Sequence, residues 1–227
     1  MNRRLSSDRI VGRDEEVRTG RLAIDSLLAR DPAHRVPLLL VAGEAGIGKS
    51  RLLDELLDDA RARAVHALCG RCLEHGGEIR PLSAISEIVA ELVPVSAALG
   101  LGIHPELTPL VDVSRDTEPT ALSQWPARLD GLLQSLLRDV SARQPVVVAI
   151  EDLHWADQTT RALLISLLRA RGLDDVLMIG TYRSDELHRR HPLLQFLAEI
   201  ERTVRCERID LAPLPDGVIA ELATAIL

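Results

Sequence analysis

One stretch of the chain combines glycines, a lysine and a hydroxyl at a spacing suited to phosphate chemistry. Residues 43–50 read Gly-Glu-Ala-Gly-Ile-Gly-Lys-Ser and match the pattern G-x-x-x-x-G-K-[ST] at every fixed position. Glycines let successive backbone N–H groups turn toward phosphate oxygens, and a following helix adds the favourable field of its N-terminus. Lys49 can reach the outer phosphates of a nucleoside triphosphate, and the Ser50 hydroxyl can bind Mg²⁺. Lys49 is the one lysine of the whole chain, which makes a chance match improbable.

A second stretch places two carboxylates directly after an apolar run. Residues 146–150 are Val-Val-Val-Ala-Ile, and Glu151 and Asp152 follow them, which is the Walker B arrangement. One acid at such a position holds Mg²⁺ or its water, and its neighbour orients or deprotonates an attacking water. By position, Glu151 takes the metal role and Asp152 the water role. The usual order is Asp first and a second acid after it, so an exchange of the two roles stays open and rapid hydrolysis is in doubt.

A third polar group ends another apolar run. Thr181, Tyr182 and Arg183 follow the apolar residues 176–180. We expect this strand to lie beside the strand that precedes Gly43, with Thr181 and Arg183 near the outermost phosphate. An arginine there would stabilise the charge that develops during phosphoryl transfer. The alternative for Arg183 is an exposed position at a strand end.

The elements that must position these groups alternate along the chain between apolar strands and amphipathic helices. Such alternation predicts a parallel α/β sheet. A stretch rich in proline at 94–118 is expected to be irregular, and a last helix is expected to start near Asp216. Helices are expected at 14–28, 50–63, 81–93, 127–141, 157–171 and 193–202, and strands at 36–42, 64–69, 146–150, 176–182 and 204–211.

Composition excludes several classes of protein. The 227 residues are 46% hydrophobic and 27% charged with mixed sign, which provides a core and argues against disorder. Apolar runs fall short of the roughly 18–20 residues that a membrane span needs. The first residues do not resemble a secretory signal, so we expect a cytoplasmic protein. A net charge of −7, with two Trp, one Tyr and one Phe, argues against a chain that mainly holds nucleic acid.

Several other features favour a structural interpretation. Cys69 and Cys72 form a C-x-x-C, but a zinc site usually needs a second pair and only Cys206 remains. We therefore expect these cysteines to pack or to stay free. The pair 154–155, His-Trp, is expected to pack its loop, and Asp157 is expected to cap a helix.

Five segments occur in an order that resembles one protein family. They are 10–16 (IVGRDEE), 43–50, 151–157 (EDLHWAD), 180–183 (GTYR) and 211–214 (LAPL). In this order they resemble the STAND class of P-loop signalling ATPases, and the chain is similar to the NTPase domain of large ATP-binding LuxR-type transcriptional regulators. The resemblance covers residues 9–214. It implies an AAA+-like three-layer α/β/α fold with a five-stranded parallel sheet and the P-loop strand central.

The resemblance also implies an organisation and a set of site residues. It implies an NTPase domain at 1–211 and the start of a truncated lid or winged-helix region at 212–227. The opening segment would contact the adenine base of the nucleotide. Pro213, which follows the last expected strand, resembles the family's proline near that base. Asp152, Glu151 and Arg183 are the expected catalytic residues, and Ser50 and Glu151 the expected Mg²⁺ ligands. The expected ATP/ADP-binding residues are Gly43, Glu44, Ala45, Gly46, Ile47, Gly48, Lys49, Ser50, Arg51, Val11, Gly12, Arg13 and Pro213.

Four functions are compatible with these features. The resemblance implies an ATP/ADP switch with slow hydrolysis in a bacterial transcriptional regulator, which self-associates on ATP binding and contacts DNA only through a missing C-terminal domain. The alternative is an AAA+ ATPase of the loader or remodelling type with steady turnover. A kinase for a small acceptor lacks a separate acceptor or lid motif here. A scaffold that binds no nucleotide conflicts with the intact Lys49 and Ser50.

Overall fold

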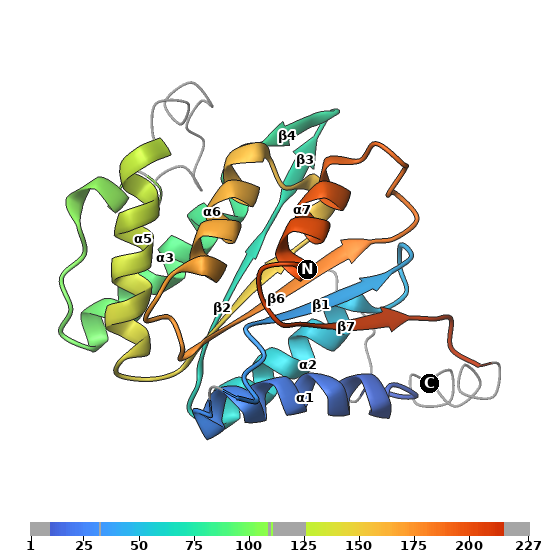
Figure 1. The fold of residues 1–227 in the computed structure, drawn as a ribbon, viewed down its shortest axis with the longest axis horizontal. Helices are drawn as coiled ribbons and strands as arrows, with labels where there is room; N and C mark the ends of the chain where they lie inside the picture. Colours follow the sequence, from blue (N-terminus) through green and yellow to red (C-terminus); the bar gives the residue numbers. More distant parts are fainter. Residues whose placement is uncertain (1–9, 32, 109, 111–125, 216–227) are drawn as a thin grey trace, which may run out of the picture.

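The protein is a three-layer α/β/α structure (Figure 1). The computed structural model describes residues 10–31, 33–108, 110 and 126–215. Helices α1 and α2 cover one face of a five-stranded parallel sheet, and α3, α5, α6 and α7 cover the other. The strands are β1 (Leu38–Gly43), β2 (His66–Arg71), β5 (Val146–Glu151), β6 (Val176–Arg183) and β7 (Cys206–Leu211). This architecture confirms the expected fold class.

The strand order refines one detail of the expectation. The order is β2-β5-β6-β1-β7, and all neighbours are parallel. The P-loop strand β1 was expected to be central, but β6 holds the middle position. The reason is that two strands, β5 and β2, extend the sheet beyond β6, whereas β7 alone lies beyond β1.

Six helices accompany the sheet in the described part of the chain. Their bounds agree with the expected ones to within a few residues, except that the helix expected at 81–93 runs on to Ala98. Pro94 lies inside that helix, and the buried Val89 and Leu92 pack the preceding turn into the core. The helix expected near Asp216 lies outside the described residues. The helices are α1 (Asp14–Ala29), α2 (Lys49–Ala62), α3 (Ser83–Ala98), α5 (Pro126–Ser141), α6 (Gln158–Arg169) and α7 (Pro192–Glu201).

Short elements complete the fold. An antiparallel hairpin of β3 (Leu73–His75) and β4 (Glu78–Arg80) follows β2, and it was not expected from the sequence. Two 3₁₀ turns, η1 (Pro105–Leu107) and η3 (Leu153–Trp155), lie in connections. Asp157 caps α6 as expected, because its carboxylate accepts the backbone N–H groups at the helix start.

Strands β1 and β5 are buried along their whole length. Alternate side chains enter two separate cores, so Leu40 faces the layer of α3 and its neighbours, while Leu39 faces α1 and α2. Strands buried on both faces read as continuous apolar runs, which is why their positions were evident in the sequence.

The edge strand β2 is protected by a helix. Glu91 and Glu87 on α3 accept the backbone N–H groups of Cys69 and Arg71 at 2.9 and 2.7 Å. These N–H groups would otherwise remain open at the sheet edge, where other chains can pair. The carboxyl end of β2 is therefore fixed beside β5.

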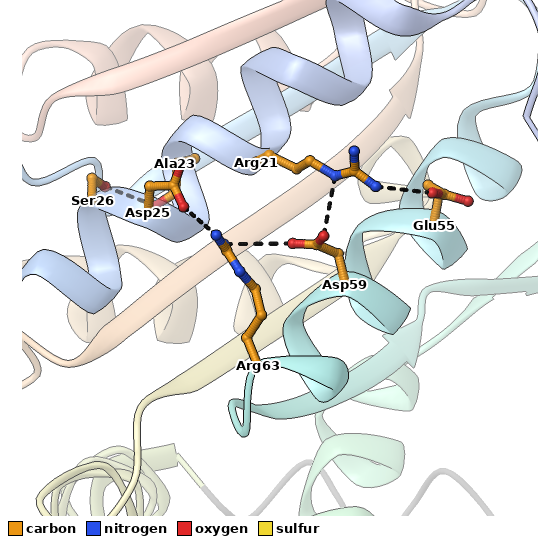
Figure 2. Close-up of polar contacts among 7 residues, drawn as sticks. All are labelled: Arg21, Ala23, Asp25, Ser26, Glu55, Asp59 and Arg63. Carbon is orange, nitrogen blue, oxygen red and sulfur yellow. Dashed lines mark hydrogen bonds and ion pairs between the residues drawn. The ribbon is translucent and has the colours of Figure 1, made fainter.

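Charged residues link α1 to α2 (Figure 2). Arg21 on α1 pairs with Glu55 and Asp59 on α2 at 3.3 and 3.1 Å. Arg63, which follows α2, returns to α1 through Asp25 at 2.5 Å and also contacts Asp59 at 3.5 Å. Each exposed pair contributes little, but the network favours one orientation of the two helices.

Within the described residues, no helix is long and apolar enough to cross a bilayer.

Candidate functional site

The glycine-rich loop joins the carboxyl end of β1 to the N-terminus of α2. Gly46 and Gly48 have φ values of 75° and 106°, in the left-handed region that other L-residues rarely adopt. A Cβ atom at either position would meet nothing within 4 Å, so the backbone conformation rather than space requires glycine. The loop thus has the local geometry that the motif predicts.

Lys49 lies inside this loop. Its side chain is buried, and Nζ donates to the carbonyl oxygens of Gly43 and Glu44 at 2.9 and 2.6 Å. Burial, followed by the nearby Arg183 charge, lowers the pKa of Lys49. An ammonium group that is poorly hydrated and positioned at the loop is suited to binding a phosphate anion.

The two expected Mg²⁺ ligands are in direct contact. The Ser50 hydroxyl donates to Oε2 of Glu151 at 2.5 Å, although 101 positions separate the two residues in the chain. The other carboxylate oxygen, Oε1, accepts from Nη2 of Arg71 at 2.6 Å. A hydroxyl and a carboxylate are oxygen ligands of the kind that Mg²⁺ prefers, so this pair fits the ion.

Arg71 was not singled out from the sequence. It stands opposite Glu151 in the register of β2 and β5, and its hydrogen bond to Glu151 is the main cause that raises its pKa. The strand order is the signal that identifies it. The sequence shows an arginine at the end of a strand, but its partner can be named only when the neighbouring strand is known.

Asp152 lies in a different environment from Glu151. It has φ 58° and is partly buried, and its backbone N–H donates to the hydroxyl of Thr181 at 3.2 Å. Burial, and then the charge of Glu151, raises the pKa of Asp152. A carboxylate with a raised pKa is a better proton acceptor, which suits the expected water role.

Arg183 reaches the site from the end of β6. Strand β6 lies beside β1 as expected, and Arg183 is paired in register with Gly43. The backbone N–H of Ser184 donates to the Gly43 carbonyl at 3.2 Å. The guanidinium group lies 5.1 Å from the ring centre of Trp155 and forms an ion pair with Glu186.

His154 packs beneath this arginine. Its side chain is fully buried, and Nδ1 accepts the backbone N–H of Arg183 at 3.4 Å. Burial lowers the pKa of His154 to about 4, so the ring is neutral near pH 7. Its ring lies 4.6 Å from that of Trp155, which agrees with the expectation that the pair packs the loop.

The opening segment reaches the same edge of the sheet. Arg13 is buried, and its guanidinium donates to Glu16 at 2.9 Å, to the Ile47 carbonyl at 3.3 Å and to the Ala212 carbonyl at 2.7 Å. It therefore connects the opening segment with the loop and with the segment after β7. The other residues proposed for nucleotide contact are partly or fully exposed; these are Val11, Gly12, Glu44, Ala45, Gly46, Ile47, Gly48, Ser50, Arg51 and Pro213.

The cysteines form no additional site among the described residues. Cys69, Cys72 and Cys206 are free, and burial raises the pKa of Cys69 and Cys206 to about 12. The described part of the chain contains no group of three His, Cys, Asp or Glu residues that could hold a metal ion.

A family model described as "AAA ATPase domain" matches residues 9–179. An uncharacterized protein of Rhizobium meliloti (strain 1021) is 31% identical over 198 residues, which are 77% of this chain and 18% of that protein. The chain thus spans less than a fifth of the length of this relative.

Solved structures share the fold at low sequence identity. Cdc6p from Pyrobaculum aerophilum has a TM-score of 0.59 at 14% identity, covering 99% of this chain and 52% of that one. A Drosophila ORC structure bound to DNA has a TM-score of 0.58 at 13% identity, covering 99% of this chain and 48% of that one. AMPPCP-bound DnaA from Aquifex aeolicus has a TM-score of 0.50 at 11% identity, covering 96% of this chain and 52% of that one. This chain therefore spans about half the length of each of these chains.

Proposed function

Because the chain belongs to the AAA ATPase domain family, we propose that it binds Mg-ATP at the carboxyl ends of β1, β5 and β6. The observation that carries this proposal is the 2.5 Å contact between Ser50 and Glu151, which brings the loop hydroxyl to the acid of β5. Ligands of open α/β sheets bind at these strand ends, where separate loops converge.

Each residue at this edge would have a distinct task. Backbone N–H groups of residues 43–50 and the Lys49 ammonium would bind the phosphates. Ser50 and Glu151 would hold Mg²⁺, which when bound neutralises charge on the outer phosphates. Asp152 would orient and deprotonate water, and Arg183 would contact the outermost phosphate.

The finer proposal is a regulatory switch. We propose that the chain is the ATP/ADP-controlled module of a cytoplasmic STAND-type transcriptional regulator, with slow hydrolysis and self-association on ATP binding. The five segments in family order and the Glu-Asp order at 151–152 support it. The NTPase domain would span 1–211 and a lid would begin at 212–227, with DNA contact left to a further domain.

The alternative is a loader or remodelling ATPase with steady turnover. The observation that favours it is the likeness to Cdc6p, ORC and DnaA structures. Identifying the nucleotide that the purified protein carries, by chromatography after denaturation, separates the two. Near-stoichiometric ADP supports the switch, whereas protein that carries no nucleotide and hydrolyses ATP steadily supports the alternative.

The nucleotide site itself is tested by Lys49→Ala. A charged hydrogen bond contributes about 1.5–3 kcal/mol, so we expect ATP and ADP affinity to fall about 10- to 100-fold in calorimetric titration. Arg169→Ala is the matched control, because it removes an exposed cation between α6 and α7 that pairs with Glu199. Circular dichroism should show both variants folded. Unchanged nucleotide binding by Lys49→Ala would contradict the proposed site.

A further inference from the structure

The two carboxylate oxygens of Glu186 lie near two different side chains, Arg183 and His154. Its Oε1 forms an ion pair with Nη1 of Arg183, three positions before it in the chain. Its Oε2 lies 3.4 Å from Nε2 of His154, a buried nitrogen that has no hydrogen bond. Since Nδ1 of His154 accepts the Arg183 N–H, the proton of the neutral ring is on Nε2. Glu186 therefore contacts Arg183 through one carboxylate oxygen, and its other oxygen lies near the neutral His154 ring.

The Arg183–Glu186 pair is suited to exchange. The side chains are 30% and 36% exposed, so water competes for both partners and the pair contributes little stability. A phosphate group offers the guanidinium two charge-assisted hydrogen bonds at once, which is a stronger arrangement. An anion at the loop would therefore compete effectively for Arg183.

Arg183 is also coupled to the phosphate loop. The Gly43 carbonyl accepts both Nζ of Lys49 and the backbone N–H of Ser184, at 2.9 and 3.2 Å. Arg183 is also paired in register with Gly43, the first residue of the loop. The two cations thus lie in one electrostatic neighbourhood, and a phosphate between them would relieve their repulsion.

We propose that Glu186 is a specificity-determining residue that competes with the outermost phosphate for Arg183 and so sets the preference for triphosphate over diphosphate. This inference rests on the proposed function, since it takes Arg183 as the contact to the outermost phosphate. A diphosphate lacks that group and leaves Arg183 with Glu186. Binding of a triphosphate has to break the pair, and its affinity is reduced accordingly.

The test measures ADP and β,γ-imido-ATP affinities with Mg²⁺ by calorimetry on the full chain. Glu186→Gln keeps the shape of the side chain and removes the charge. We expect it to strengthen imido-ATP binding about two- to fivefold, as loss of an exposed pair predicts, with ADP binding unchanged. Arg183→Ala should weaken imido-ATP binding alone, and Glu186→Gln should then have no further effect in the double variant.

A matched control removes a similar pair elsewhere. Glu199→Gln removes the charge of the residue that pairs with Arg169 across α6 and α7, where Nη2 of Arg169 lies 2.8 Å from Oε1 of Glu199. This change should alter neither the ADP nor the imido-ATP affinity. Thermal unfolding should show that all variants remain folded.

The outcomes separate this inference from the proposed function. If Arg183→Ala weakens imido-ATP binding but Glu186→Gln leaves both affinities unchanged, or shifts both equally, the role of Glu186 is overturned while the nucleotide site stands. If the wild type binds neither nucleotide, or if Arg183→Ala does not alter the preference, both the inference and the assignment of Arg183 are overturned.

Discussion

The two acids at the end of β5 differ in what surrounds them. Glu151 contacts Ser50 and Arg71, whereas Asp152 is next to Thr181 and has a raised pKa. This difference supports the proposal that Glu151 takes the metal role and Asp152 the water role.

Substitution of each acid tests that assignment. Asp152→Asn should retain Mg-ATP binding and reduce single-turnover hydrolysis about 10²- to 10⁴-fold, the usual contribution of a general base. Glu151→Gln should instead weaken the Mg²⁺ dependence of nucleotide binding, measured by titration at several Mg²⁺ concentrations. The reverse pattern, with slow hydrolysis from Glu151→Gln and lost Mg²⁺ dependence from Asp152→Asn, would show that the roles are exchanged.

His154 makes stability depend on pH. Its pKa is about 4 in the fold because of burial, and about 6.5 in an unfolded chain. Between these values the unfolded state binds more protons, so stability decreases as pH falls from 6.5 to 4. His154→Gln should show a smaller decrease in melting temperature between pH 7 and pH 5. Burial also lowers the pKa of His66 and His191, but both remain in either protein. Equal pH dependence would contradict the buried neutral ring.

The sequence identified some of these residues and not others for a physical reason. Lys49, Ser50 and Glu151 belong to local patterns whose spacing already encodes a loop or a strand end. Arg71 and Glu186 acquire their roles from partners that the fold brings close, through strand order in one case and loop geometry in the other. Side-chain contacts of this kind leave no periodic pattern in the amino-acid sequence by which they could be predicted.

At the scale of elements, strands buried on both faces were predictable because each is a continuous apolar run. The β3–β4 hairpin was missed because its strands have three residues each and show no alternation, although Gly76 and Gly77 mark the turn. The end of α3 was missed because the proline-rich stretch 94–118 was expected to be irregular. In the structure the helix continues through Pro94, because burial of its apolar face outweighs the lost hydrogen bond.

Glycines at two elements should respond in opposite ways to alanine. A Cβ at Gly70 on β2 would lie 2.1 Å from the Ala84 carbonyl oxygen, so the backbone of α3 must move away. Gly131 on α5 is exposed and has nothing near its Cβ position. Gly70→Ala should therefore reduce the free energy of unfolding by about 1–3 kcal/mol or more. Gly131→Ala should increase it by about 0.5–1 kcal/mol through helix propensity.

Urea denaturation of the two variants and the wild type provides the measurement. Since both changes add one methyl group to a glycine, each variant is the chemical control for the other. Equal effects on the unfolding midpoint would mean that β2 and α3 are not in the close contact described here.

At the scale of the whole molecule, the site lies where segments from the entire described chain converge. The sheet order brings the carboxyl ends of β1, β5 and β6 to one edge of the sheet. The edge strand β2 lies beside β5 and contributes Arg71, which donates to Glu151. Arg13 closes this arrangement, because one guanidinium joins the opening segment, the phosphate loop and the start of the segment after β7. The fold class was predictable from alternation, but this convergence depends on long-range contacts.

Arg13→Ala tests whether that junction links nucleotide binding to the segment after β7. Removing the guanidinium leaves the Ile47 and Ala212 carbonyls without this partner, which should cost about 1–3 kcal/mol of stability. In the wild type, ADP should slow hydrogen exchange both in the loop and in the amides of β7, because loop and strand end share one donor. In Arg13→Ala the loop should still respond to ADP, while the response of β7 is lost. A response of β7 that persists in the variant would show that the coupling passes through the β1–β7 pairing itself rather than through Arg13.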